Sequence, residues 1–199
     1  LAAVMQLFTE TALEIGEGQQ YDMDFETRLD VTEDEYIEMI RLKTSVLLAC
    51  ALKIGAILGG ASASDANLLY RFGEQVGLAF QLQDDLLDVY GDTAVFGKAI
   101  GGDITSNKKT YMLINAFNRA DNRQRQKLTQ WVNARQFNRQ EKIAAVTKIY
   151  DEIGIRRLCE EKIRFFFDKA VLLLDQVSVS PLRKKELRSY TAQMMNRES

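Results

Sequence analysis

The stretch FQLQDDLLD, residues 80–88, carries the strongest chemical signal in the sequence. Gln81, Asp84, Asp85 and Asp88 stand at positions i, i+3, i+4 and i+7, so on a helix they form one polar stripe between apolar neighbours. Converging carboxylates without histidine suit Mg²⁺, which takes one or two carboxylates together with waters and substrate phosphates. The stripe therefore indicates a metal site, although a solvated acidic face of an amphipathic helix has the same periodicity.

A glycine-rich segment, GKAIGGDITSNKKTY at 97–111, supplies groups of the opposite sign. Its glycines let the backbone approach a ligand closely, and Lys98, Lys108 and Lys109 could supply positive charge. Asp103 could add one more carboxylate. Together with the acidic stripe, the segment indicates a metal–diphosphate site, in which lysines meet phosphate oxygens directly and carboxylates meet them through Mg²⁺. Solvated surface loops of this composition are also common, and the P-loop pattern GxxxxGK[ST] is absent.

A third signal is Lys43 followed by Thr44, midway along an apolar stretch of helical text. Such a lysine can extend to water along its aliphatic stem, and a threonine hydroxyl usually bonds back to its own helix. If this helix faces the acidic stripe, Lys43 could instead neutralise a diphosphate. Thr44 and Gln81 would then direct oxygen dipoles toward developing positive charge.

The composition excludes several other kinds of site. The 199 residues include no histidine, so histidine-based triads and histidine-ligated metals are excluded, and oxygen donors favour Mg²⁺, Ca²⁺ or Mn²⁺. A net charge of −2 gives no electrostatic support for nucleic-acid binding. The apolar stretch 46–63 predicts a buried core helix and no membrane span. Two isolated cysteines, Cys50 and Cys159, fit a reducing compartment, so we expect a cytoplasmic protein.

The elements that must position these groups are predicted to be helices, because the single proline leaves long uninterrupted segments. We expect one all-α domain over 1–199. Small residues four apart, at 51, 55 and 59 and at 73 and 77, predict closely approaching helices. A first helix should end at Gly16 and Gly18, followed by an acidic loop, and a capping box at Thr32 should open the second. The predicted helices are 1–15, 33–58, 64–90, 109–118, 121–133, 139–153, 155–177 and 181–195, with a loop at 91–108.

The motifs resemble those of the trans-isoprenyl diphosphate synthases, the polyprenyl synthetase family. FQLQDDLLD resembles the second aspartate-rich motif of this family, and the other matches are co-linear with it: EGQQYDMD at 17–24, Lys43-Thr44, and the segments 77–92 and 97–111. The resemblance implies a bundle of long helices around a central cavity, usually as a homodimer. It also implies Mg²⁺-assisted ionisation, with Mn²⁺ as a substitute, of an allylic diphosphate that then condenses with isopentenyl diphosphate to a short-chain product.

The resemblance also implies a role for each matching residue. Those implied for the metal site are Asp84, Asp88, the adjacent Asp85 and a supporting Asp103. Those implied to bind the leaving diphosphate are Lys43, Lys98 and Lys108. Thr44 and Gln81 are implied to stabilise the carbocation, and Phe80 to lie beside isopentenyl diphosphate.

One part of the family pattern is absent from these 199 residues, namely the first aspartate-rich motif. Asp22, Asp24 and Glu26 alternate in the predicted acidic loop and do not replace it. We therefore expect a carboxy-terminal portion of a longer synthase, without the amino-terminal helices and with little turnover of its own. Two alternatives stay open: a non-catalytic regulatory subunit of a prenyl synthase, and a Mg²⁺-dependent terpene cyclase.

Overall fold

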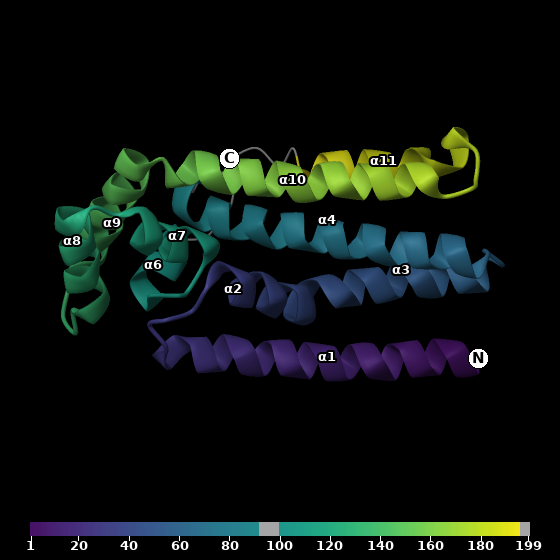
Figure 1. Cartoon of the computed structure of the whole chain (residues 1–199), viewed down its shortest axis with the longest axis horizontal. Helices are drawn as coiled ribbons and strands as arrows, with labels where there is room; N and C mark the ends of the chain where they lie inside the picture. Colours follow the sequence, from purple (N-terminus) through teal and green to yellow (C-terminus); the bar gives the residue numbers. More distant parts are fainter. Residues whose placement is uncertain (92–99, 196–199) are drawn as a thin grey trace.

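The computed structural model describes residues 1–91 and 100–195, and within these ranges the chain forms helices and no strand (Figure 1). The prediction of an all-α fold is therefore confirmed. The helices are α1 (Ala2–Thr27), α2 (Glu33–Ile40), η1 (Arg41–Ser45), α3 (Val46–Leu58), α4 (Ala63–Tyr90), α6 (Gly102–Ser106), α7 (Tyr111–Arg119), α8 (Asn122–Asn133), α9 (Arg139–Ile153), α10 (Ile155–Gln176) and α11 (Pro181–Met195).

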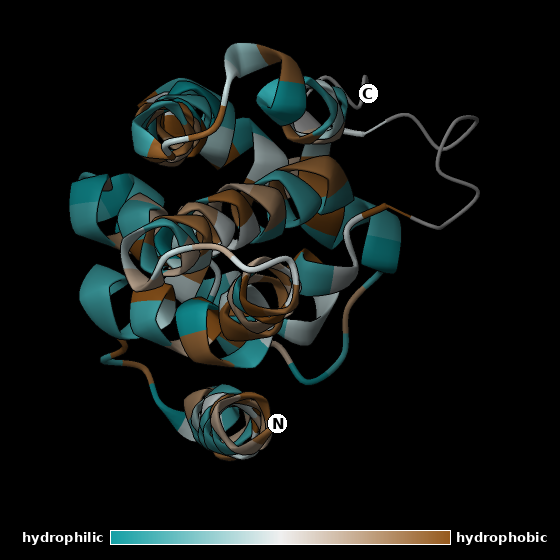
Figure 2. Ribbon diagram, turned by 90° about the vertical axis from the view of Figure 1, so that its right-hand side faces the viewer, coloured by the Kyte–Doolittle hydropathy of each residue, from teal (hydrophilic) through white to brown (hydrophobic). Residues whose placement is uncertain are grey.

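The long helices lie side by side, with α4 in the middle of the bundle. It packs against α3 on one side and α10 on the other, while α1 packs on α2, η1 and α3 (Figure 1). The short helices α6–α9 gather at one end, and Figure 2 shows α1 set at one side of the bundle. The larger apolar cluster includes Tyr36, Leu82, Met112 and Ile163, and is continuous from α2 through α4 to α10. This packing fixes the position of α4, which carries the acidic stripe.

Helix α1 continues well beyond its predicted end. It runs through Gly16 and Gly18 to Thr27, so Asp22, Asp24 and Glu26 lie on a helix, and the prediction of an acidic loop was wrong. The backbone of η1 lies directly against Gly18, where an added Cβ would come within 2.8 Å of the Leu42 carbonyl carbon. An interior glycine costs a helix only about 1 kcal/mol relative to alanine, and this close contact offsets that cost.

The predicted helix 33–58 is present but is divided by one π-helical turn. The capping box is confirmed: the Thr32 hydroxyl accepts from the Glu35 amide, and the Glu35 side chain accepts from the Thr32 amide. In η1 the backbone hydrogen bonds span five residues instead of four, and the Val46 amide donates to the Arg41 carbonyl. Such turns often occur at functional sites, and this one contains Lys43 and Thr44.

Small residues allow α4 to approach η1 and α3, as predicted for Gly73 and Gly77. An added Cβ would lie 2.6 Å from the Ala49 Cα at Gly73 and 2.6 Å from the Ser45 Cα at Gly77. The companion prediction for α3 was wrong, because a Cβ at Gly55 would meet nothing within 4 Å. The close contact therefore lies on the opposite face of α3.

The predicted loop 91–108 is partly helical, because Gly102–Ser106 forms α6. Lys98 and Asp92 lie outside the described residues. The remaining helices follow the predicted order, and their ends differ from the predicted ones by at most two residues. In the part of the chain that the structure describes, no helix is long and apolar enough to cross a membrane.

Candidate active site

Asp85 is the buried centre of the acidic stripe. Its carboxylate is 2% exposed and accepts hydrogen bonds from the Tyr36 hydroxyl and from the Gln81 amide, at 3.0 Å. The Lys108 ammonium lies 3.6 Å from Oδ1. Burial raises the pKa of Asp85, while Lys108 and the two donors favour the ionised form. Asp85 therefore joins three elements, α2, α4 and the turn after α6.

Asp88 connects α4 to the start of α6. Its two carboxylate oxygens accept the backbone amides of Gly102, at 3.2 Å, and Asp103, at 2.9 Å. The Asp88 carbonyl also accepts from the Gly101 amide at 2.6 Å, where the glycine has a left-handed φ of 79°. These bonds fix the position of residues 101–103 relative to the stripe. Each carboxylate oxygen keeps a lone pair for a further ligand.

Asp103 and Lys108 face each other across the α6 turn, 3.7 Å apart. Burial and the nearby carboxylates, chiefly Asp85, raise the pKa of Asp103 to about 7, against the effect of Lys108. Burial alone would lower the pKa of Lys108, but Asp85 and Asp103 raise it overall. Burial of Asp103 beside other carboxylates therefore favours its protonated form when no cation is bound.

Thr44 and Lys43 reach different neighbours because η1 lies between α1 and α4. The Thr44 hydroxyl donates to the Gln81 Oε1 at 3.0 Å, and since Gln81 in turn donates to Asp85, the three side chains form one chain of hydrogen bonds. The Lys43 ammonium contacts Asp22 of α1 at 2.6 Å. Both partners of this ion pair are partly exposed.

A pocket of about 370 Å³ opens between α1 and the turn after α6. Asp22, Phe25 and Glu26 line it from α1, and Lys108 and Lys109 line it from the other side. Lys108 thus contacts the buried Asp85 and also borders open space. A ligand in this pocket would meet an ammonium that is already held in place.

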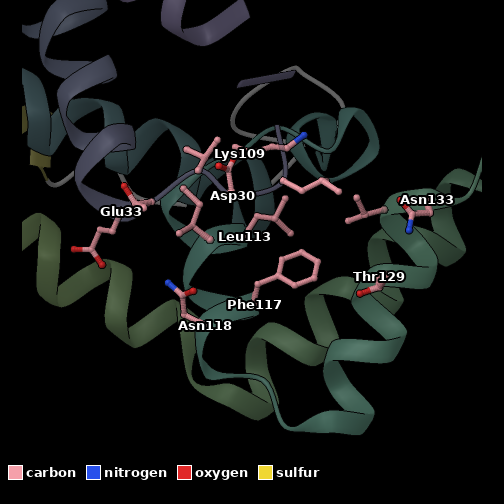
Figure 3. Close-up of a pocket in the computed structure, with 13 residues that line it drawn as sticks. Asp30, Glu33, Lys109, Leu113, Phe117, Asn118, Thr129 and Asn133 are labelled. Carbon is pink, nitrogen blue, oxygen red and sulfur yellow. The ribbon is translucent and has the colours of Figure 1, made fainter. Parts of the chain in front are cut away.

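A second pocket of about 370 Å³ has no residue of the acidic stripe in its lining (Figure 3). The side chains of Leu113 and Phe117 from α7 and Thr129 from α8 line it, together with the segment 29–33. Of the charged residues predicted for the active site, Lys109 lines this pocket, whereas the acidic stripe and Lys108 do not. The first pocket is linked to the stripe through Lys108, which lines that pocket and contacts Asp85.

Most of the predicted residues do come together. Those joined by hydrogen bonds or ion pairs are Thr44, Gln81, Asp85, Asp88, Asp103 and Lys108. Lys43 lies next to them on η1, Phe80 is half-buried on α4, and Asp84 is exposed. Lys98 falls outside the described residues.

Two residues of the site were not predicted. Tyr36 lies seven positions before Lys43 on the same run of helix, and this spacing could have placed both on one face. Asp22 stands in the EGQQYDMD motif but was assigned to a loop. The ion pair between Asp22 and Lys43 depends on the continuation of α1 to Thr27. This continuation was not predicted, because Gly16 and Gly18 were interpreted as the end of the helix.

The carboxylate oxygens of the site suit a hard divalent cation that a bound phosphate ligand also helps to hold. Within 1–91 and 100–195, no three acidic or cysteine side chains converge closely enough to hold a metal ion unaided. Mg²⁺, however, is commonly held by one or two carboxylates, with phosphate oxygens and waters completing the octahedron. The exposed Asp84 and the remaining lone pairs of Asp88 meet that requirement.

Comparison with known proteins identifies the class. Residues 2–152 match the family model "Polyprenyl synthetase", and the chain therefore belongs to the polyprenyl synthetase family. The geranylgeranyl diphosphate synthase of Methanosarcina mazei is 51% identical over 113 residues, which are 57% of this chain and 35% of that relative.

Solved structures agree with this assignment. A crystal structure of a geranylgeranyl pyrophosphate synthase superposes with a TM-score of 0.93 at 39% identity, covering 100% of this chain and 62% of the other. A geranylgeranyl pyrophosphate synthase from Corynebacterium glutamicum, complexed with isoprenyl diphosphate and magnesium, gives 0.90 at 28% identity, covering 100% and 56%. In each comparison the chain spans less than two thirds of the relative's length.

Proposed function

We propose that this chain is part of a prenyltransferase that condenses an allylic diphosphate with isopentenyl diphosphate to give a short-chain trans-polyprenyl diphosphate. The observation that carries the proposal is the position of Lys108, which is held by Asp85 and Asp103 and borders the pocket. An ammonium held there suits a diphosphate oxygen. The names of the relatives, which are geranylgeranyl and geranylfarnesyl diphosphate synthases among others, support a short product.

In this proposal Mg²⁺ would be held by Asp84 and Asp88, with Asp103 supporting them and Mn²⁺ as a substitute. When bound, the metal would supply positive charge that helps the diphosphate to leave. The solved relative that contains isoprenyl diphosphate and magnesium supports this choice of metal. The grouping of Asp84, Asp88 and Asp103 around the start of α6, where Asp88 accepts the Asp103 amide, also supports a cation site.

The chain's own residues would bind and orient the substrate. Lys43, Lys98 and Lys108 would bind the oxygens of the leaving diphosphate. Because the Lys43–Asp22 ion pair is partly exposed, it is worth only about 0–1 kcal/mol, and a diphosphate would replace Asp22 as the partner of Lys43.

The allylic cation would be stabilised by side-chain oxygens at the end of the hydrogen-bond chain. Thr44 and Gln81 would present oxygen dipoles to the positive carbon, and the bond between Gln81 and Asp85 would fix the orientation of the amide. Phe80 would lie beside isopentenyl diphosphate. The fixed orientation matters because such dipoles then need no rearrangement as charge develops.

We further propose that residues 1–199 alone turn over little substrate. They contain one DDxxD motif, whereas the resemblance implies two motifs that face each other across the metal ions. Opposite charges about 4 Å apart interact by roughly 4 kcal/mol at an effective dielectric near 20, so several missing ligands would strongly weaken metal and diphosphate binding.

The test is an assay of the full-length protein with farnesyl diphosphate, labelled isopentenyl diphosphate and Mg²⁺. We expect chain elongation, and we expect Asp84→Asn with Asp88→Asn to abolish it. Asp168→Asn is the matched control, because Asp168 is exposed on α10 and the same change there should leave the rate intact. Formation of a cyclic hydrocarbon would instead identify a terpene cyclase, and complete inertness would identify a regulatory subunit.

We also propose a cytoplasmic homodimer. Helix α1 exposes large apolar side chains, including Phe8, Leu13 and Met23, which a second copy would cover. Cys50 and Cys159 are both free and buried, which supports a reducing compartment. Light scattering of the full-length protein should give twice the monomer mass, and a monomeric mass would contradict the dimer.

A further inference from the structure

Lys142 on α9 is a completely buried lysine that the proposed chemistry does not use. Its ammonium donates to the Asn107 Oδ1 at 2.6 Å and lies 4.2 Å from the ring centroid of Phe137. Among residues 1–91 and 100–195, Lys142 forms no ion pair, and burial, with no contribution from a nearby carboxylate, lowers its pKa. A buried amine without a counter-ion is costly, so the hydrogen bond from Lys142 to Asn107 needs a physical explanation.

Asn107, the partner of Lys142, has an unusual backbone conformation. Its φ of 57° is left-handed, and within the described ranges no other non-glycine residue has a positive φ. Its amide is held at both ends, because Nδ2 donates to the Val132 carbonyl at 3.1 Å while Oδ1 accepts from Lys142. Helices α8 and α9 therefore hold this residue in place from outside the active site.

The turn at Asn107 determines where Lys108 points. Asn107 is the C-cap residue of α6, and the amide of the next residue, Lys108, donates to the Asp103 carbonyl at 3.0 Å. The Lys108 ammonium then reaches Asp85 at 3.6 Å and Asp103 at 3.7 Å. A rotation of the backbone at Asn107 would turn Lys108 away from both carboxylates and from the pocket.

We propose that Lys142 is a positioning residue, which acts through the side chain of Asn107 to hold Lys108 where it binds the diphosphate. The inference rests on the proposed function, since it assigns a purpose to the placement of Lys108. The proposal gives α9, which contains none of the predicted site residues, a role in positioning the site. Lys142 itself does not touch the substrate.

The test measures binding of inorganic pyrophosphate to the full-length protein in the presence of Mg²⁺ by titration calorimetry. Lys142→Met keeps the length and the apolar stem of the side chain and removes the donor. Loss of such supporting contacts typically costs about 10–100-fold, so we expect pyrophosphate affinity to fall about 10-fold. Lys148→Met is the matched control, because Lys148 is exposed on the same helix, and it should bind as the unaltered protein does.

A second pair of variants separates positioning from general stability. Asn107→Gly keeps the left-handed turn accessible and removes both side-chain bonds, so it should lower affinity as Lys142→Met does. In a Lys108→Met background, Lys142→Met should cause no further loss, because the ammonium that it positions is gone. A merely structural lysine would instead lower affinity by the same factor in both backgrounds.

The outcomes distinguish this inference from the proposed function. Normal pyrophosphate binding by a folded Lys142→Met variant would overturn the inference and leave the proposed function intact, as would a full further loss in the Lys108→Met background. Failure of the unaltered protein to bind pyrophosphate with Mg²⁺ would overturn the proposed function, and the inference with it. Weakened binding that depends on Lys108 would support both.

Discussion

The contact between α4 and η1 predicts that one added methyl group has opposite effects at two glycines. At Gly77 an added Cβ would lie 2.6 Å from the Ser45 Cα and 2.7 Å from its Cβ, and the backbone atom cannot rotate away. At Gly55 the added Cβ would meet nothing within 4 Å. Both residues are interior to helices, so the intrinsic preference for alanine is the same at the two positions.

The expected magnitudes follow from these contacts. Alanine in a helix interior gains about 1 kcal/mol over glycine, and Gly55→Ala should raise the free energy of unfolding by up to that amount. Overpacking costs typically about 1–3 kcal/mol, and a contact this short belongs at the upper end. The gain and the cost together give a net loss of about 1–2 kcal/mol for Gly77→Ala.

Urea unfolding of the two variants of the full-length protein, followed by circular dichroism, measures both changes. Gly77→Ala should also reduce prenyl transfer, because Thr44 next to Ser45 bonds to Gln81 one turn after Gly77. A Gly77→Ala protein at least as stable as the unaltered one would refute the reasoning. Shifts of the same sign in the two variants would show that contact with η1 does not decide the outcome.

Three further predictions concern the charged groups of the site. Tyr36→Phe removes a donor from the buried Asp85 and should lower the free energy of unfolding by about 1–3 kcal/mol in urea titrations. In metal-free protein, the pKa of Asp103 is raised from 3.8 to about 7, so the folded state binds a proton that the unfolded state releases. The free energy of unfolding should therefore fall as the pH rises from about 4 to about 7. Asp103→Asn should flatten this dependence of the free energy of unfolding on pH. Lys43→Met should slow prenyl transfer while changing unfolding by no more than about 1 kcal/mol, since its ion pair is partly exposed.

Local signals in the sequence predicted the elements that depend on local interactions. The Thr32 capping box marks the start of α2, and the period of the apolar residues predicted most of the later helices. The course of α1 through Gly16 and Gly18 depends instead on the contact between Gly18 and η1, which is distant in sequence. The π-helical turn was likewise not predicted, because one regular α-helical period was assumed over 33–58, whereas the turn inserts one residue.

In the acidic stripe, the sequence pattern likewise predicted the helix face but not the burial of each residue. Periodicity placed Asp84 and Asp85 on one face of a helix, but it could not predict that one would be exposed and the other buried. That difference depends on Tyr36 from α2 and Lys108 from the turn after α6, which both contact Asp85. The partnership of Lys43 with Asp22 depends on α1 in the same way.

The unequal burial of the stripe implies that its carboxylates have different tasks. Asp85 already has two hydrogen-bond donors and an ammonium, and in its buried position it would be a poor ligand for a hydrated cation. Through its ion pair with the Lys108 ammonium, Asp85 instead holds Lys108 in place. Asp84 is exposed, and each Asp88 carboxylate oxygen accepts one backbone amide, which leaves lone pairs available for a metal ion. Replacement of Asp85 by Asn should therefore weaken pyrophosphate binding even without Mg²⁺, whereas replacement of Asp84 should matter only when the metal is present.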